Sequence, residues 1–338
     1  MRIPAGDPRA RGRAYGAAIA ERLPAIWAAY EPVFRLYAGV EQADALRLGE
    51  AALAAVRRWR PELAEELQGV AEGAGLPVEV VASLNARTEL MVQPECATVG
   101  RVRVEGAAPW LAQNWDWFLD APERCMVVSS PEFVTFTEAG ILAKIGVNAA
   151  GLALSLDILN HASDRRAPVG VPIHLLLREV LGACATVDDV EALLRTVDVS
   201  ASSCLTVVTA DGDGAMFEVA PEGVARLAAD PDGLLSHTNS FVDPVLAAGD
   251  RVALPGPSCT RHADLKAIRP RTIAEARAAL SSHAAEPVPV CRHGLPGPSG
   301  LPPTGTAACV VLDPMARAMD VGLGPPCEAR FERFALVE

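Results

Sequence analysis

The chain has 338 residues, of which 50% are apolar and 21% charged, a composition typical of a well-packed globular protein. Its formal net charge of −12 argues against a nucleic-acid-binding protein, because phosphate binding needs clustered Lys and Arg. The start lacks the apolar core of a signal peptide and no apolar run is long enough for a bilayer, so we expect a cytoplasmic protein without membrane contact.

The pattern from residue 8 to about 90 predicts helices. Residues 17–23 are rich in good helix formers, and residues 43–59 place apolar side chains at helical spacing. Pro61 suits the first turn of a further helix, and Gly73 and Gly75 suit its end. We therefore expect a helical N-terminal part.

Beyond Cys96 the period changes from helical to alternating. Strands are predicted over 111–115, 125–128, 133–138, 141–146, 152–156, 204–209, 215–219, 223–227, 307–312 and 318–321. Helices are predicted over 172–182, 188–196 and 257–268 and after Thr272, and a Pro/Gly-rich loop over 284–305. Because strands and helices do not alternate regularly, the order favours antiparallel sheets with helices outside over a doubly wound parallel sheet.

The eight cysteines lie at positions 96, 125, 184, 204, 259, 291, 309 and 327. None forms a Cys-x-x-Cys pair, and a chain of this size needs no disulfides, so we expect mostly buried, unreactive thiols. The six histidines show no metal-ligand spacing, and neither a dinucleotide fingerprint nor a phosphate loop is present. The sequence therefore predicts no metal ion and no cofactor.

Cys96 stands where the strand-rich part begins, and short motifs follow one another on both sides of it. The series is Arg11-Gly12, Tyr15-Gly16, Leu84-Asn85-Ala86-Arg87-Thr88-Glu89, Cys96-Ala97-Thr98, Gln113-Asn114-Trp115-Asp116, Phe136-Thr137-Glu138-Ala139-Gly140, Gly146-Val147-Asn148, Gly151, Gly170-Val171-Pro172 with His174, His237-Thr238-Asn239, Arg261-His262 and Cys291-Arg292. In this order the motifs resemble the acyl-coenzyme A:6-aminopenicillanate (isopenicillin N) acyltransferase family, whose members are autoproteolytic cysteine-type N-terminal-nucleophile (Ntn) hydrolases. The resemblance extends over nearly the whole chain.

This resemblance implies an α+β fold, a four-layer αββα sandwich of antiparallel sheets preceded by a helical portion. It further implies self-cleavage between Glu95 and Cys96, which divides one structural unit into an α chain, residues 1–95, and a β chain, residues 96–338. Cys96 would then supply both the thiol nucleophile and, through its new α-amine, the base. The substrate would be a small acyl amide or acyl thioester, with acyl-coenzyme A possible as a substrate, and a homo-oligomer is possible.

The resemblance also implies roles for residues downstream of Cys96. Asp116 matches the active-site aspartate and Asn239 the oxyanion-binding asparagine. Arg261 and Arg292 match arginines that orient Asp116 or bind a substrate carboxylate. Thr98 and Asn114 are expected to support the site.

Three alternative hypotheses remain besides an N-acyl amide hydrolase. One is an N-acyltransferase of secondary metabolism that takes its acyl group from coenzyme A or a carrier protein. Another is an uncleaved scaffold, because Glu95 replaces a glycine of the penicillin enzyme and Pro303 an arginine of the family. A third is a thiol-bearing binding protein that never cleaves.

Overall fold

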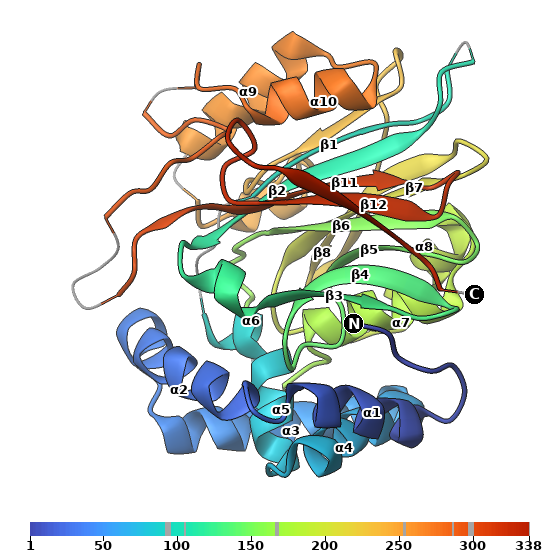
Figure 1. Cartoon of the computed structure of the whole chain (residues 1–338). Helices are drawn as coiled ribbons and strands as arrows, with labels where there is room; N and C mark the ends of the chain where they lie inside the picture. The colour runs from blue at the N-terminus through green and yellow to red at the C-terminus, as the bar shows by residue number, and fades with distance from the viewer. Residues whose placement is uncertain are drawn as a thin grey trace.

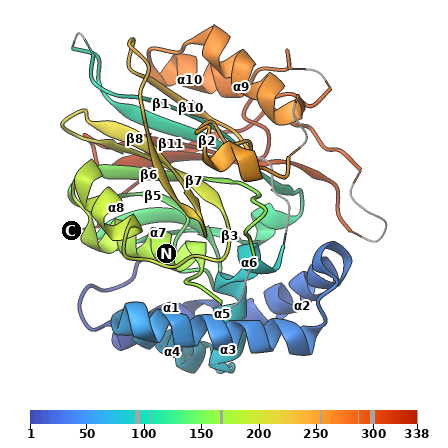
Figure 2. The same cartoon turned by 180° about the vertical axis from the view of Figure 1, so that it is seen from behind.

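The structure, a computed structural model, describes residues 1–91, 96–104, 106–165, 169–252, 255–285, 287–296 and 301–337. Two antiparallel sheets lie face to face, and helices cover the outer side of each (Figures 1 and 2). This confirms the predicted α+β fold with αββα layers. Among the described helices, none is both long and apolar enough to cross a membrane.

Before Cys96 the described chain is helical, apart from an isolated bridge at Arg2. The helices are α1 (Pro8–Ile19), α2 (Leu23–Val33), the π-helical turn η1 (Phe34–Ala38), α3 (Gln42–Trp59), α4 (Pro61–Ala74), α5 (Val78–Asn85) and α6 (Arg87–Leu90). As predicted, Pro61 opens α4 and Gly75 follows it in the left-handed conformation. Helix α1 packs against α4 so closely that a Cβ atom at Gly16 would come within 2.1 Å of the Val70 carbonyl oxygen.

The first sheet has the strand order β10-β1-β2-β11-β12-β13. Its strands are β1 (Cys96–Arg101), β2 (Trp110–Phe118), β10 (Leu234–His237), β11 (Thr304–Asp313), β12 (Ala318–Leu323) and β13 (Phe331–Ala335). Strand β1 thus lies between β2, which follows it in the chain, and β10, which comes much later. This placement brings the residues after β10 beside Cys96.

The second sheet is a meander in which seven strands pair in chain order. They are β3 (Cys125–Ser129), β4 (Phe133–Glu138), β5 (Ile145–Asn148), β6 (Leu152–Ile158), β7 (Ser203–Thr209), β8 (Gly214–Ala220) and β9 (Gly223–Ala228), with the 3-10 turn η2 (Ala121–Arg124) ahead of β3. The apolar faces of the two sheets bury one continuous core, which contains Cys96, Trp115, Phe136 and Leu156.

Two pairs of helices complete the layers. Helices α9 (Pro257–Ile268) and α10 (Ile273–Leu280) cover the first sheet, and α7 (Ile173–Ala183) and α8 (Val187–Leu194) cover the second (Figure 1). The 3-10 turn η3 (Leu246–Gly249) precedes α9. Thr272 caps α10 by accepting a hydrogen bond from the Glu275 backbone, as its capping-box sequence predicts.

The predicted strand over 141–146 is wrong in its first four residues, because β5 begins at Ile145. Asn85 of α5 explains the difference. Its amide donates to the Gly140 carbonyl and accepts from the Leu142 N–H, at 2.8 and 3.0 Å. These bonds hold residues 140–142 in a turn, and periodicity within the segment carries no signal of a partner 55 residues away.

Candidate active site

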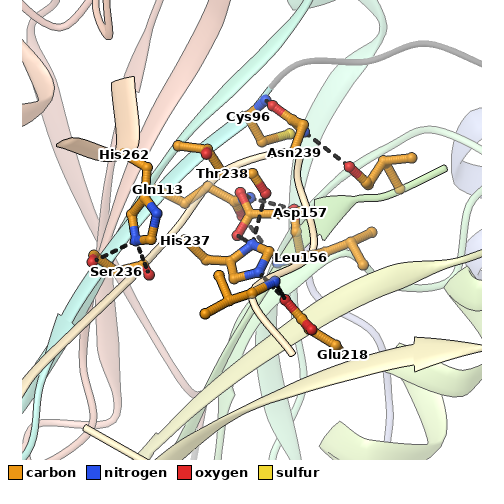
Figure 3. Close-up of polar contacts among 12 residues, drawn as sticks. Cys96, Gln113, Leu156, Asp157, Glu218, Ser236, His237, Thr238, Asn239 and His262 are labelled. Carbon is orange, nitrogen blue, oxygen red and sulfur yellow. Dashed lines mark hydrogen bonds and ion pairs between the residues drawn. The ribbon is translucent and has the colours of Figure 1, made fainter. Parts of the chain in front are cut away.

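Cys96 opens β1 at a buried position between the two sheets. It pairs with Trp115 of β2 and is only 1% exposed. Its backbone N–H donates to Oδ1 of Asn239 at 2.9 Å, across 143 residues of sequence (Figure 3). Asn239 lies directly beyond β10, so the pairing of β10 with β1 produces this contact.

The Asn239 side chain is fixed by several partners. Its Oδ1 also accepts from the guanidinium of Arg261 on α9 at 2.8 Å, and its Nδ2 donates to the Ile158 carbonyl at 3.0 Å. Cys96 N–H and Arg261 both donate, so the oxygen of the amide must face them. Ser258 holds the Asn239 backbone N–H at 2.9 Å. The structure therefore brings Cys96, Asn239 and Arg261 together.

Asp116 lies near the end of β2, where it pairs with Thr306 of β11. The Thr306 hydroxyl donates to its carboxylate at 2.7 Å, and Nη1 of Arg292 lies 3.7 Å from the other oxygen. Thr306 also accepts from the Arg292 backbone N–H at 3.0 Å. Asp116 is 1% exposed, so this charge is shielded from water and held by a threonine and an arginine. The thiol of Cys96 interacts with the Asp116 backbone.

A second buried carboxyl group, Asp157 of β6, faces the site from the opposite sheet. The Gln113 amide donates to it at 3.4 Å, Thr98 lies close enough to lower its pKa, and Nδ1 of His237 lies 4.0 Å away. His237 in turn contacts Glu218 at 2.8 Å, as Figure 3 shows. Burial raises the pKa of Asp157 to about 7, although His237 and the hydrogen bonds oppose the rise.

The Cys96 thiol is protonated at neutral pH in this form. Burial is the main reason that its pKa is raised, and the carboxylates of Asp157 and Asp116 raise it further. The Asp116 backbone and Lys144 oppose the rise without reversing it. A thiol in this state would need a nearby base to become a nucleophile, since the thiolate is the reactive form.

Cys96 also lines a small cavity between the two sheets. It has a volume of about 20 Å³, room for roughly one water molecule. Its lining includes Trp115, Trp117, Lys144, Ile158 and His174.

Behind this cavity lies a buried cluster of charges around Glu138 of β4. Nζ of Lys144 lies 3.4 Å from the Glu138 carboxylate, Nη2 of Arg87 at 2.6 Å and the Tyr30 hydroxyl at 2.5 Å. Burial alone raises the pKa of Glu138, but Arg87 and Lys144 outweigh burial and hold it at about 2. Burial lowers the pKa of Lys144 to about 7 despite the Glu138 charge.

Not all of the remaining predicted positions lie at the site. Thr98 lies beside Asp157 of the site, whereas Asn114 faces the opposite side of the sheet and donates to the carbonyls of Leu280 and Val290. Glu95, the proposed cleavage position, lies outside the described residues. Sequence reasoning missed Asp157, Lys144 and Thr306. Lys144 and Asp157 could have been found, because each is a charged residue inside a strongly apolar stretch, and a buried charge usually has a partner.

A second, much wider groove of about 890 Å³ lies between α3, α8 and β8–β9. Its lining includes none of the residues grouped around Cys96. The candidate active site is therefore the small cavity that Cys96 lines and not the wide groove.

Comparison with known proteins decides the family. The family model described as acyl-coenzyme A:6-aminopenicillanic acid acyl-transferase matches residues 102–327. The chain belongs to this family. Cys96 lies just before the matched segment.

A curated relative is the 40 kDa form of acyl-coenzyme A:6-aminopenicillanic-acid-acyltransferase from Emericella nidulans, 32% identical over 193 residues. The match covers 54% of this chain and 52% of that protein, so the chain spans about half the length of this relative. Among solved structures, penicillin V acylase from Agrobacterium tumefaciens is 19% identical with a TM-score of 0.45, covering 67% of this chain and 82% of that one. A mutant of conjugated bile acid hydrolase from Clostridium perfringens is 11% identical with a TM-score of 0.49, covering 72% and 98%.

Proposed function

We propose that the chain is a self-processing cysteine enzyme that cleaves N-acyl amides, or transfers their acyl groups, through a thioester on Cys96. One observation carries this proposal. The backbone N–H of Cys96 donates to Oδ1 of Asn239 in a buried position, and Arg261 holds this oxygen by donating to it as well. The Cys96 nitrogen becomes the α-amine if the preceding peptide bond breaks. Family membership supports the same chemistry.

Self-processing would proceed in two steps. The Cys96 sulfur adds to the Glu95 carbonyl carbon, the peptide C–N bond breaks, and the thiol proton passes to the departing nitrogen. Water then hydrolyses the thioester, which leaves a carboxyl group on Glu95 and restores the thiol. The products are residues 1–95 and 96–338, which together contain the atoms of one added water.

The new α-amine would then act as the base. An α-amine has an unperturbed pKa of about 8, much closer to neutral than that of lysine, so it can take the thiol proton at working pH. This matters here because burial raises the pKa of the thiol. The sulfur attacks the amide carbonyl of the substrate, the proton passes through the α-amine to the leaving amine, and an acyl thioester remains. Water as acceptor releases an acid, and an amine as acceptor gives a new amide.

The surrounding residues would have distinct tasks. Asp116, held by Thr306 and Arg292, places a negative charge beside the thiol and the new ammonium group. Asn239 holds the α-nitrogen, and Arg261 holds Asn239 by donating to the same amide oxygen. Asn239 would also serve as an oxyanion donor through the second N–H of its Nδ2, since the first donates to the Ile158 carbonyl.

Intact mass spectrometry tests self-processing. The parent chain and Cys96→Ala are expressed and purified identically, with Cys184→Ala as the control because Cys184 caps α7 on the far side of the second sheet. We expect two fragments, 1–95 and 96–338, from the parent and the control, and one full-length species from Cys96→Ala. A single full-length mass from all three would refute self-processing and favour the scaffold.

A second experiment distinguishes hydrolase from transferase. The mature protein is mixed with N-acyl amides or with acyl thioesters plus an amine, and the mass of the Cys96 fragment is followed with the products. Free acid from the amide indicates a hydrolase, and a new amide from the thioester indicates a transferase. If no donor acylates Cys96, the hypothesis of an enzyme that works through an acyl thioester on Cys96 is wrong.

A further inference from the structure

Four potential metal ligands meet at one end of the first sheet, in a place that the site around Cys96 does not use. They are His283, which follows α10, Cys291 and His293 in the loop before β11, and Cys327, which follows β12. One ligand atom from each lies within 4.8 Å of all the others. Cys291 is buried, whereas the other three are exposed. An ion from solvent can therefore reach the group.

The separations of the ligand atoms are close to those of a tetrahedral site, although two of them are slightly shorter. The two sulfurs are 3.5 Å apart, and Nε2 of His293 lies 3.1 Å from the Cys327 sulfur and 3.8 Å from the Cys291 sulfur. Nε2 of His283 lies 3.1 Å from Nε2 of His293. Around a tetrahedral Zn²⁺, with bonds of about 2.3 Å to sulfur and 2.0–2.1 Å to nitrogen, ligand atoms stand roughly 3.3–3.8 Å apart.

The shell around these ligands is also suited to a metal. Nδ1 of His293 lies 3.5 Å from the Glu328 carboxylate, the arrangement that orients a metal-bound imidazole and fixes Nε2 as the coordinating atom. The backbone of Cys291 donates to the Ser282 carbonyl at 2.9 Å, which ties the segment carrying Cys291 and His293 to the one carrying His283. A turn closed by Pro325 holds Glu328 beside Cys327.

We propose that His283, Cys291, His293 and Cys327 bind one Zn²⁺ ion in a structural Cys₂His₂ site. Zinc favours this mixture of sulfur and imidazole nitrogen in fully protein-ligated, four-coordinate sites. Binding releases one proton from each thiol to solvent, so the two thiolates balance the charge of the ion. No ligand position is left for a substrate, so the ion stabilises the fold and takes no part in the reaction.

The site would join three separate segments beside the Cys96 centre. Arg292 lies between the ligands Cys291 and His293, and its backbone exchanges hydrogen bonds with Thr306, which donates to Asp116. An ion that fixes Cys291 therefore also fixes the arginine and the threonine that hold Asp116. In this sense Cys291 is a positioning residue for Asp116.

The proposal is tested by metal analysis of the full chain, purified without an affinity tag and under reducing conditions. The variants are Cys327→Ser and His283→Gln, both at exposed ligands, and the control is Cys259→Ser, a half-exposed cysteine on α9 outside the cluster. We expect about one zinc per chain in the parent and the control, and less than roughly a tenth of that in both ligand variants. A chelator should lower the melting temperature of the parent and leave that of Cys327→Ser unchanged.

Replacement of zinc by Co²⁺ gives a readout of geometry. We expect sulfur-to-cobalt charge-transfer absorption and the intense visible bands of tetrahedral cobalt in the parent, and loss of both in Cys327→Ser. Two results would overturn the proposal. One is a Cys291–Cys327 disulfide that persists in the reducing buffer, seen as a mass lower by two hydrogens in the peptides that carry these two cysteines. The other is a chain whose thiols are free and which binds neither zinc nor cobalt when they are added. Because no readout involves turnover, failure of the zinc site and failure of the proposed enzyme activity are separate outcomes.

Discussion

Replacing Glu138 by glutamine should destabilise the fold more than any surface charge change. Glu138 is fully buried in β4, and its carboxylate contacts Arg87 at 2.6 Å, the Tyr30 hydroxyl at 2.5 Å and Lys144 at 3.4 Å. Tyr30 and Arg87 precede Cys96 in the chain, whereas Glu138 and Lys144 follow it. The cluster therefore connects the two parts that self-cleavage would separate.

The size of the effect follows from the charges that remain. Glutamine keeps the shape but removes the negative charge, which leaves Arg87 and Lys144 as buried cations. Lys144 can lose its proton, because its pKa is lowered to about 7, but a guanidinium stays charged at any working pH. Removing one partner of a buried ion pair costs about 3–5 kcal/mol. Part of the Arg87 charge stays compensated by the Trp117 ring, 4.4 Å away, so we expect about 3 kcal/mol, the lower end of that range.

The assay is urea denaturation followed by tryptophan fluorescence, since Trp115 and Trp117 lie beside the cluster. All variants carry Cys96→Ala, so that the chain stays covalently continuous and unfolding involves one species. Glu65→Gln is the matched control, because Glu65 pairs with Arg9 at 2.8 Å but the two side chains are 51% and 38% exposed. Such an exposed pair contributes less than about 1 kcal/mol.

The reasoning is refuted if Glu138→Gln costs no more than the Glu65 control. The dependence on pH gives a second check. Glu138 has a folded-state pKa of about 2, below its ordinary 4.5, so its contribution is present above pH 4.5 and lost as the pH falls toward 2. Glu138→Gln should remove this part of the acid sensitivity. A variant with the same acid profile as its parent would contradict the assignment.

Two further predictions concern burial. Asp157 has a raised pKa of about 7 against an ordinary 3.8, so its folded form holds an extra proton between these values and stability falls as the pH rises through them. Asp157→Asn should remove a decrease of up to about 4 kcal/mol between pH 4 and 8, and an unchanged slope in urea titrations would contradict this. Gly16→Ala should cost at least about 1–3 kcal/mol by forcing α1 from α4, because its Cβ would lie 2.1 Å from the Val70 oxygen. Gly223→Ala, where a Cβ meets nothing within 4 Å, should be neutral in the same melts.

Much of the fold could be predicted because its signals are local. Apolar spacing predicted α3, a capping threonine predicted the start of α10, and alternation predicted the strands of the meander. Strands β1, β10 and β13 are absent from the predicted set. Strand β10 has only four residues, and β13 carries charges at Glu332 and Arg333 with none of its residues buried, so neither shows the alternation of a half-buried strand. Ile141 was placed in a strand because nothing in its own segment shows that Asn85 holds the adjoining turn.

Some residues of the candidate site could likewise be predicted from the sequence and others could not. The ordered motifs identified the family and singled out Cys96, Asp116, Asn239 and Arg261, and these residues do meet in the structure or act on the same thiol. Asp157 was not found, because its role depends on the second sheet lying against the first. No periodicity within β6 encodes that contact.

The sequence by itself determined where helices give way to strands and which cysteine stands at that boundary. Both depend on neighbouring residues and on motif order. Only the tertiary structure decided that the Cys96 nitrogen meets Asn239 from 143 residues away, since this requires β10 to pair with β1. The same holds for His283, Cys291, His293 and Cys327. Their spacing in the chain predicts no metal site, and they converge because the segments after α10, before β11 and after β12 meet at one end of the first sheet.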